Sequence, residues 1–289
     1  MSTRRHHAPA TPAPATGSPT AESRVRESPT TGSLIGDAWI LTRRQFWHWR
    51  AQPGAVAVGL LFPVLVTLMF GAFFGGAIAG PGGDYYSFLM PGIFVMAMLF
   101  GLETTMTGVC TDAGAGVTDR FRSLPIHPAA VVLGRCLADL IFAVLGLIVL
   151  MATGLALGWR WTDGIAGALA AVALLLALRF ALLWVGIHVG LVAPGAETVA
   201  AVQILVWPLS MLSNIFVDPA TMPGWLGTLA SWNPLSATAT ATRELFGNPT
   251  WTEPTWVDEH ATALAIGWPV VITVVFVPLA VRQYRRLGG

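Results

Sequence analysis

The sequence predicts an all-α polytopic membrane protein, and three observations carry that prediction. Of the 289 residues, 54% are apolar and only 11% are charged, whereas an ordinary soluble domain has about 25% charged residues. The mean hydropathy is +0.66, and the apolar runs are long enough for helices that cross about 30 Å of hydrocarbon. Transmembrane strands would alternate in hydropathy over about ten residues, and these runs do not.

Six apolar stretches are the predicted transmembrane helices, because each has about 20 residues or more. They are residues 54–78, 88–111, 129–157, 165–193, 198–217 and 260–281, which together make 54–281 a transmembrane domain. Pro63 and Pro208 lie inside spans, where neighbouring helices and local adjustments satisfy the freed carbonyls. The fifth span is polar at its far end, since Ser210, Ser213 and Asn214 follow Pro208.

The segment before the first span divides into a tail and a helix. Residues 1–32 are rich in Pro, Ala, Ser and Thr, which predicts a disordered cytoplasmic tail. This tail lacks the apolar run of a cleaved signal peptide. Residues 33–53 are predicted to form an interfacial elbow helix. Trp39, Phe46 and Trp49 recur there at helical spacing beside arginines, as suits a helix in the headgroup region. A plain juxtamembrane helix is the alternative.

The positions of the arginines set the predicted orientation, since inner loops carry an excess of basic residues. With the N-terminus inside, the inner segments hold Arg4, Arg5, Arg24, Arg26, Arg43, Arg44, Arg50, Arg120, Arg122, Arg135, Arg282, Arg285 and Arg286, and the outer ones hold Arg160 and Arg243. This asymmetry predicts six spans with both termini cytoplasmic and residues 282–289 as a basic cytoplasmic tail. The chain has no lysine, which excludes P-loop, Schiff-base and kinase-type lysine chemistry.

The connection between the second and third spans, Thr111 to Pro128, is predicted to hold a short amphipathic cytoplasmic helix. Asp112 can cap it, and Leu124-Pro125 ends it. Such a helix suits a membrane subunit that receives force from a soluble partner, because its apolar side is buried and its charges fix the register. A solvated loop with helical propensity is the alternative. The candidate residues are Asp112, Gly116, Val117, Asp119, Arg120, Phe121, Arg122, Leu124 and Pro125.

The segment between the fifth and sixth spans is predicted to form an extracellular cap of re-entrant or interfacial helices. Its tryptophans mark an interface in which amphipathic rings are stable. Asn233-Pro234 begins a new helical segment, because the residue before a proline is disfavoured in the α region. An extracellular loop that rests on lipid is the alternative. The candidate cap residues are Pro223, Trp225, Asn233, Pro234 and Arg243.

Ionisable side chains inside the spans are functional candidates, because their burial in a membrane is costly. Arg135 and Asp139 are four residues apart, which predicts an ion pair along one helix. Arg179 lies near the middle of the fourth span and needs an acceptor, for which we expect Glu103. The Glu103–Arg179 pair either orients two helices or lines a translocation path for an amphiphile. His188 is interpreted as a hydrogen-bonded packing residue, with proton coupling as the alternative.

Two segments of the chain resemble ABC-2 type transporter permeases, in particular the daunorubicin-resistance type of drug exporter. In the first, Asp112, Gly116, Arg120 and Leu124 recur four apart, before a helix that opens AAVVLGRCLAD. The second, FVDPATMPGWLGTLASWNPLSATATATRELFG, contains Pro219, Met222-Pro223, Trp225-Leu226, Asn233-Pro234 and Arg243 in the order of the family. The resemblance covers roughly Gly36 to Arg286. Ala113, Gly114 and Ala115 replace more charged residues that the family usually has.

The resemblance implies a six-helix half-permease in a bacterial plasma membrane. It would dimerise with a second permease subunit, identical or different, and pair with two copies of a separately encoded ATP-binding subunit. The loop that contains Arg120 would be the coupling helix that docks on this ATPase. ATP and magnesium would bind to the partner, so that this chain would be a non-catalytic subunit without a cofactor, in contact with membrane lipid and not with nucleic acid. The substrate would be amphiphilic or hydrophobic: a drug, an antibiotic or a lipid.

Two other classes fit the sequence less well. An ion- or proton-coupled secondary carrier that acts without an ATPase requires related halves and several convergent carboxylates, and the chain has few acidic residues in its spans and no evident repeat. A membrane-embedded enzyme requires a clustered catalytic set, and the motifs HExxH, GxSxG and CxxC are absent. Cys110 and Cys136 are predicted to be buried thiols.

Overall fold

The computed structural model describes residues 34–74, 85–116, 128–250 and 255–286. All of them belong to one compact unit, which extends from Thr31 to Gly289. The other unit, Met1–Thr30, lies outside the described residues, and with it most of the tail predicted over residues 1–32.

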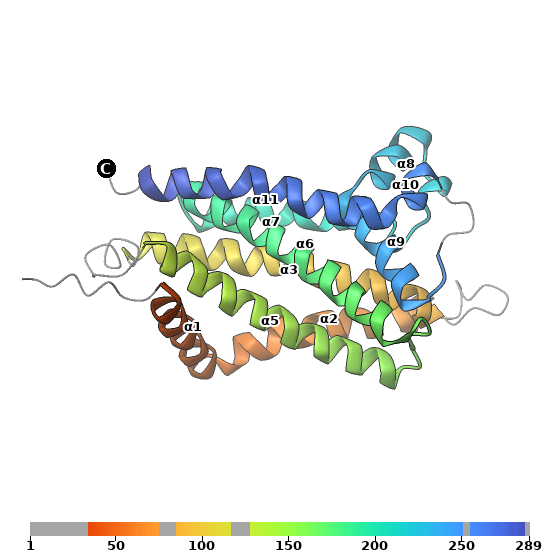
Figure 1. The fold of residues 1–289 in the computed structure, drawn as a ribbon, viewed down its shortest axis with the longest axis horizontal. Coiled ribbons are helices and arrows are strands. Elements are labelled where there is room, and N and C mark those ends of the chain that lie inside the picture. Colours follow the sequence, from red (N-terminus) through yellow and green to blue (C-terminus); the bar gives the residue numbers. More distant parts are fainter. Residues whose placement is uncertain (1–33, 75–84, 117–127, 251–254, 287–289) are drawn as a thin grey trace, which may run out of the picture. The chain divides into compact units, whose positions relative to one another are not determined.

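All regular secondary structure in the described ranges is helical (Figure 1). The elements are α1 (Leu34–Ala51), α2 (Pro53–Phe74), α3 (Tyr85–Gly114), α5 (Pro128–Ala156), α6 (Gly164–Val192), α7 (Ala196–Met211), the 3-10 turn η1 (Pro219–Thr221), α8 (Gly224–Ser231), α9 (Pro234–Phe246), α10 (Trp256–Glu259) and α11 (Ala261–Arg286).

Five of these helices, α2, α3, α5, α6 and α11, are long and apolar enough to cross a membrane. They correspond to the first, second, third, fourth and sixth predicted spans, so the prediction of an all-α protein with long apolar helices suited to cross a membrane is confirmed for the described residues. Helix α3 is longer than predicted at both ends, with 30 residues. Helix α2 ends at Phe74, and the last residues of its predicted span lie outside the described ranges.

The fifth predicted span corresponds to α7, an apolar helix of only 16 residues. It ends at Met211, and turns and bends occupy residues 212–217, which were predicted to be helical. Two side chains near this end compete with the helical backbone for hydrogen bonds. Ser210 Oγ donates to the carbonyl of Trp207 at 2.8 Å, and Ser213 Oγ donates to the carbonyl of Ser210.

Helices α3 and α6 form the centre of the bundle. Their apolar stretches are 67% and 56% buried inside the protein, whereas those of α2, α5 and α11 are only 17–28% buried. Met90, Ile93 and Phe94 of α3 are fully buried. A Cβ atom added to Gly190 of α6 would lie 2.7 Å from the backbone oxygen of Met106, so the two helices meet backbone to backbone. Small residues permit such close approach between membrane helices.

Helix α1 packs against the first half of α5, at a steep angle to it (Figure 1). Thr42 of α1 is fully buried and donates a hydrogen bond to the carbonyl of Gly134 at 3.1 Å. Trp49 contacts Phe142 of α5, with ring centroids 5.2 Å apart, whereas Trp39 is exposed. The helix predicted over residues 33–53 is therefore present, and one residue, Gln52, separates it from α2.

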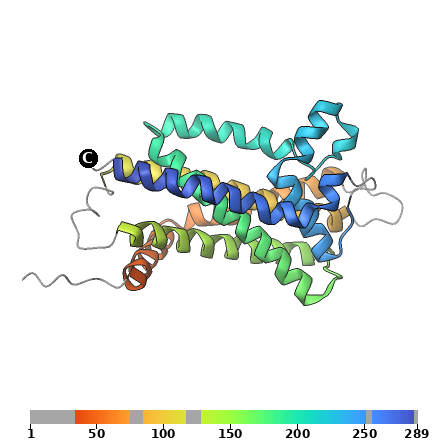
Figure 2. The ribbon, with the colours of Figure 1, turned by 45° about the horizontal axis from the view of Figure 1, so that its top comes forward.

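The two ends of the bundle differ in structure and in charge. Helix α1 lies at one end, with the last turn of α3, the start of α5 and the end of α11; η1, α8, α9 and α10 gather at the opposite end in both views (Figures 1 and 2). The described arginines at the α1 end include Arg43, Arg44 and Arg50 of α1, Arg135 of α5, and Arg282 and Arg286 of α11; Arg160 and Arg243 lie at the opposite end.

Candidate functional site

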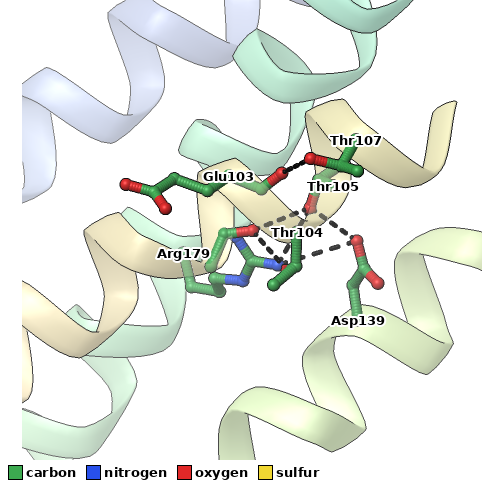
Figure 3. Close-up of polar contacts among 7 residues, drawn as sticks. Glu103, Thr104, Thr105, Thr107, Asp139 and Arg179 are labelled. Carbon is green, nitrogen blue, oxygen red and sulfur yellow. Dashed lines mark hydrogen bonds and ion pairs between the residues drawn. The ribbon is translucent and has the colours of Figure 1, made fainter. Parts of the chain in front are cut away.

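A buried arginine organises a polar cluster between α3, α5 and α6 (Figure 3). Arg179 of α6 exposes 3% of its surface, and its Nη2 donates a hydrogen bond to Thr105 Oγ1 of α3 at 3.0 Å. Thr105 Oγ1 donates in turn to Asp139 Oδ2 of α5 at 2.7 Å. The same carboxylate oxygen lies 3.6 Å from Arg179 Nη2. A threonine thus bridges an ion pair whose two charges balance within the protein.

The packing of α3 on α6 gives this arginine its position. A Cβ atom added to Gly101 would lie 2.5 Å from Arg179 Cζ, so the guanidinium rests directly on the backbone of α3. Gly101 and Thr105 are four residues apart and therefore share one face of the helix. Gly186 of α6 continues the contact, since a Cβ there would lie 3.0 Å from Thr105 Cβ.

The structure corrects two predicted partners. Asp139, not Glu103, is the acidic partner of Arg179. Glu103 follows Gly101 by two residues, about 200° around the helix, and Figure 3 shows its carboxylate pointing away from the guanidinium. Arg135 pairs with Asp112 and not with Asp139. Its Nη1 lies 2.8 Å from Asp112 Oδ2. That Glu103 and Arg179 line a translocation path or orient helices stays a prediction.

A cavity of about 210 Å³ lies beside this cluster. Glu103, Thr104 and Arg179 contribute its polar lining. The Nη1 atom of Arg179 is buried and has no hydrogen-bond partner among the described residues. The other walls are apolar and come from α2, α3, α5 and α7. Their aromatic rings belong to Phe62, Phe100, Phe142 and Trp207.

The end of α3 contains the only described part of the predicted coupling helix. Asp112 does not cap a separate helix, as was predicted, because α3 continues to Gly114 and the Asp112 side chain pairs with Arg135. Gly116 has a φ of +65°, a left-handed conformation that favours glycine after a helix. The remaining residues predicted for this helix lie outside the described ranges: Val117, Asp119, Arg120, Phe121, Arg122, Leu124 and Pro125.

The start of α9 confirms the predicted role of Asn233-Pro234 as a helix start. Asn233 Oδ1 accepts a hydrogen bond from the backbone N–H of Leu235 at 2.9 Å, and Pro234 occupies the first helical position. Asn233 Nδ2 also donates to the carbonyl of Leu209 at 3.1 Å and to that of Leu212. One side chain therefore joins α9 to the end of α7.

The short helices beside α9 expose aromatic rings. Pro223 precedes the first turn of α8, and Trp225 on that helix is 70% exposed. The rings of Trp232 and Trp256 stack with centroids 6.0 Å apart. An exposed group of indole rings suits a membrane interface.

Arg243 of α9 is fully buried and anchors this end of the bundle. Its Nη2 donates to the carbonyl of Ile215 at 3.0 Å, and its Nε donates to that of Phe88 at 3.2 Å. Its Nη groups also lie 3.3 Å from the carbonyl of Asn214. Burial lowers the pKa of Arg243 to about 9, an effect that the Asp258 carboxylate opposes, so the guanidinium stays charged at neutral pH.

The described residues contain no group of three or more His, Cys, Asp or Glu side chains that could hold a metal ion. Cys110 and Cys136 are free thiols.

Long apolar helices around a buried ion pair define a multi-pass membrane protein. The family model of the ABC-2 type transporter matches residues 37–246. The chain is 37% identical over 228 residues to the daunorubicin resistance ABC transporter permease protein DrrB1 of Streptomyces coeruleorubidus, an alignment that covers 78% of each protein. It is 25% identical over 258 residues to the probable doxorubicin resistance ABC transporter permease protein DrrC of Mycobacterium tuberculosis, covering 88% of this chain and 90% of the relative. This chain therefore belongs to the ABC-2 type transporter family, as a permease.

Proposed function

We propose that this chain is the membrane subunit of an ATP-driven exporter that moves an amphiphilic or hydrophobic compound, such as a drug, an antibiotic or a lipid, out of a bacterial cell. The observation that carries the proposal is the 37% identity, along 78% of the chain, to a permease named for daunorubicin resistance. The apolar, aromatic lining of the cavity beside Arg179 suits such a substrate.

The proposed topology has six spans, with α7 as the fifth, and both termini in the cytoplasm. The excess of arginines at the α1 end supports this orientation under the positive-inside rule. Helix α1 then lies at the inner membrane surface, and α8, α9 and α10 form the extracellular cap. Exposed Trp225 on α8 and the stacked rings of Trp232 and Trp256 support a position of the cap at the outer interface.

The proposed motor is a separate ATP-binding subunit, present in two copies in a complex with two permease subunits. This chain is then non-catalytic, and ATP and magnesium bind to the partner. The loop between α3 and α5 serves as the coupling helix. The ion pair between Asp112 and Arg135 joins the two helices that flank this loop. Closure of the ATPase dimer shifts the loop and thereby biases the bundle between inward-open and outward-open states.

ATP-driven export is tested with the permease and its ATP-binding subunit in proteoliposomes. We expect transport of a hydrophobic dye to continue after a protonophore collapses the proton gradient, and to stop when ATP is replaced by a non-hydrolysable analogue. The alternative, a proton-coupled carrier, predicts the opposite pattern: transport that needs the gradient and is indifferent to ATP. That pattern would refute the proposal.

Replacing Arg120 and Phe121 together with alanine is expected to uncouple the two subunits. Because the coupling loop would lose a charge and an apolar contact, substrate should stimulate the ATPase about tenfold less than in the wild-type complex. Membrane insertion should be unchanged. Arg282→Ala removes an equal charge from an exposed position at the same end of the bundle and should leave the stimulation intact. Full stimulation in the double variant would count against the assignment of this loop.

A further inference from the structure

Helix α1 has two different faces. On one face, Thr42 donates a hydrogen bond to the carbonyl of Gly134 of α5 at 3.1 Å. On the same face, Trp49 contacts Phe142 of α5, with ring centroids 5.2 Å apart. Residues three or four apart share a face of a helix. Four exposed residues have this spacing on the opposite face, and we call them the exposed stripe of α1: Ile40, Arg43, Trp47 and Arg50.

The two arginines of the exposed stripe have no acidic partner in the described structure. Neither Arg43 nor Arg50 has a hydrogen bond or an ion pair with a described residue. Helix α1 packs on α5 and α2, but α2 has no charged residue, and Asp139 of α5 already pairs with Arg179. Asp37, the only acidic residue of α1, lies six residues before Arg43, about 120° away around the helix. The counter-charge for both arginines therefore has to come from outside the described structure.

The position of α1 along the bundle brings this stripe to the headgroups of the proposed inner leaflet. Helix α5 has 29 residues, about 43 Å at 1.5 Å per residue. It exceeds the roughly 30 Å of hydrocarbon by about 13 Å. Thr42, in the middle of α1, meets Gly134 six residues after the start of α5, or about 9 Å along it. The middle of α1 is thus close to the boundary between headgroups and hydrocarbon, at the end of the bundle on the left of Figure 1.

The side chains of the stripe suit an anionic lipid surface. Ile40 and Trp47 expose 66% and 62% of their surface, and such residues insert between the headgroups and acyl chains beside an interfacial helix. Arg43 follows Ile40 by three positions, and Arg50 follows Trp47 by three, so each guanidinium flanks an apolar side chain. Each arginine near an anionic membrane surface strengthens binding to it. A zwitterionic surface has phosphates but no net charge to attract them.

The contacts of α1 connect this stripe to the helices that flank the proposed coupling loop. Thr42 binds the carbonyl of Gly134, and the next residue, Arg135, forms the ion pair with Asp112 at the end of α3. A Cβ atom added to Gly134 would lie 2.8 Å from the carbonyl oxygen of Ala38, so α5 rests directly on the backbone of α1. The start of α5 therefore cannot shift relative to α1 without breaking these contacts. When lipid holds α1, the helices that flank the loop have a fixed support.

We propose that the exposed stripe of α1 binds anionic phospholipids of the inner leaflet, and that this binding strengthens the coupling between the ATP-binding subunit and the helix bundle. Arg43 and Arg50 bind the lipid phosphates, while Ile40 and Trp47 insert beside them. Lipid favours the state in which both arginines reach the headgroups, and this difference between states makes it an effector. The lipid binding goes beyond the proposed function, whereas the effect on coupling rests on it.

Lipid binding is tested with the full-length permease alone. Native mass spectrometry of the protein in detergent measures its affinity for phosphatidylglycerol, which is anionic, and for phosphatidylcholine with the same acyl chains. We expect Arg43→Gln combined with Arg50→Gln to weaken phosphatidylglycerol binding about tenfold and phosphatidylcholine binding less than about twofold. Lysine at both positions keeps the charges and should retain most of the affinity. Arg282→Gln combined with Arg286→Gln removes two exposed charges from the same end of the bundle, without a neighbouring tryptophan, and should have less than about a twofold effect.

The effect on coupling is tested with the permease and its ATP-binding subunit in phosphatidylcholine nanodiscs, with and without phosphatidylglycerol. We expect phosphatidylglycerol to raise the substrate-stimulated ATPase rate of the wild-type complex about fivefold. Thr42→Val keeps the shape of the side chain but loses the hydrogen bond to Gly134. It should bind phosphatidylglycerol as the wild type does and yet lose this increase. Thr67→Val is the matched control, because Thr67 is equally buried but donates within α2, to the carbonyl of Pro63.

The proposal is overturned by equal affinity of the wild type for the two lipids, by equal losses in the α1 and α11 variants, or by a full response of Thr42→Val to phosphatidylglycerol. It is also overturned if the α1 arginine variant binds the ATP-binding subunit more weakly while its lipid affinity is unchanged, which would assign the arginines to a protein surface. Lipid binding requires neither ATP nor the partner. Charge-dependent lipid binding without ATP-driven export refutes only the proposed function, and export without such binding refutes only this inference.

Discussion

Replacing Asp139 with asparagine is expected to destabilise the permease by about 3–5 kcal/mol. The substitution keeps the size of the side chain and an oxygen that can accept the Thr105 hydrogen bond, but it removes the charge that balances Arg179. The guanidinium then remains buried, at 3% exposure, without an ionised partner. Thermal unfolding in mild detergent measures the loss as a lower midpoint temperature.

Two comparisons make this result specific. Glu103→Gln neutralises a carboxylate on a neighbouring helix that does not pair with Arg179, so it should not lower the midpoint. Combining Asp139→Asn with Arg179→Gln should cost less than the sum of the single losses, because the double variant leaves no unpaired charge. If Glu103→Gln and not Asp139→Asn destabilised the protein, the ion pair described here would be wrong.

Replacing Arg243 with methionine should have an effect of similar size, about 3 kcal/mol or more. The variant loses charge-assisted hydrogen bonds and leaves the carbonyls of Phe88, Asn214 and Ile215 short of donors. Arg243→Lys should recover only part of the loss, because a single ammonium group cannot replace the planar fork of donors. The measurement is again the unfolding midpoint, together with the rate of proteolysis at residues 212–217.

A matched control for Arg243 lies at the same end of the bundle. Arg160 also donates to backbone carbonyls, those of Leu155 and Trp159, but it is exposed to solvent. Water can satisfy the same carbonyls after Arg160→Met, so that variant should lose about 1 kcal/mol or less. Equal losses in the two variants would contradict an anchoring role for Arg243.

The helices were predictable from the sequence wherever long apolar runs decide the structure. Five spans match within a few residues, and Asn233-Pro234 marks the start of α9, because a residue before proline rarely stays helical. The end of α7 was predicted six residues too late. Apolar residues continue to Val217, but hydroxyl side chains take over the backbone hydrogen bonds at the end of the helix.

The polar partners were less predictable, because they depend on which helix faces meet. Glu103 and Asp139 were both available acids for Arg179, and the sequence does not give the rotation of α3. Gly101 and Thr105, a small residue and a hydroxyl four residues apart, mark the face of α3 that meets α6. Thr105 was not predicted, because Thr104 and Thr107 lie beside it in the sequence and nothing there distinguishes it from them.

The shortness of α7 has a consequence for how the chain crosses the membrane. Its 16 residues span about 24 Å at 1.5 Å per residue, less than the roughly 30 Å of a hydrocarbon layer. Lipid offers no hydrogen bonds to the backbone beyond the helix end. Asn233 and Arg243 provide them instead, to the carbonyls of Leu209, Leu212, Asn214 and Ile215. Asn233, which caps α9, and Arg243 within α9 thus supply hydrogen bonds where helical turns are missing, as the proposed crossing of the membrane by α7 requires.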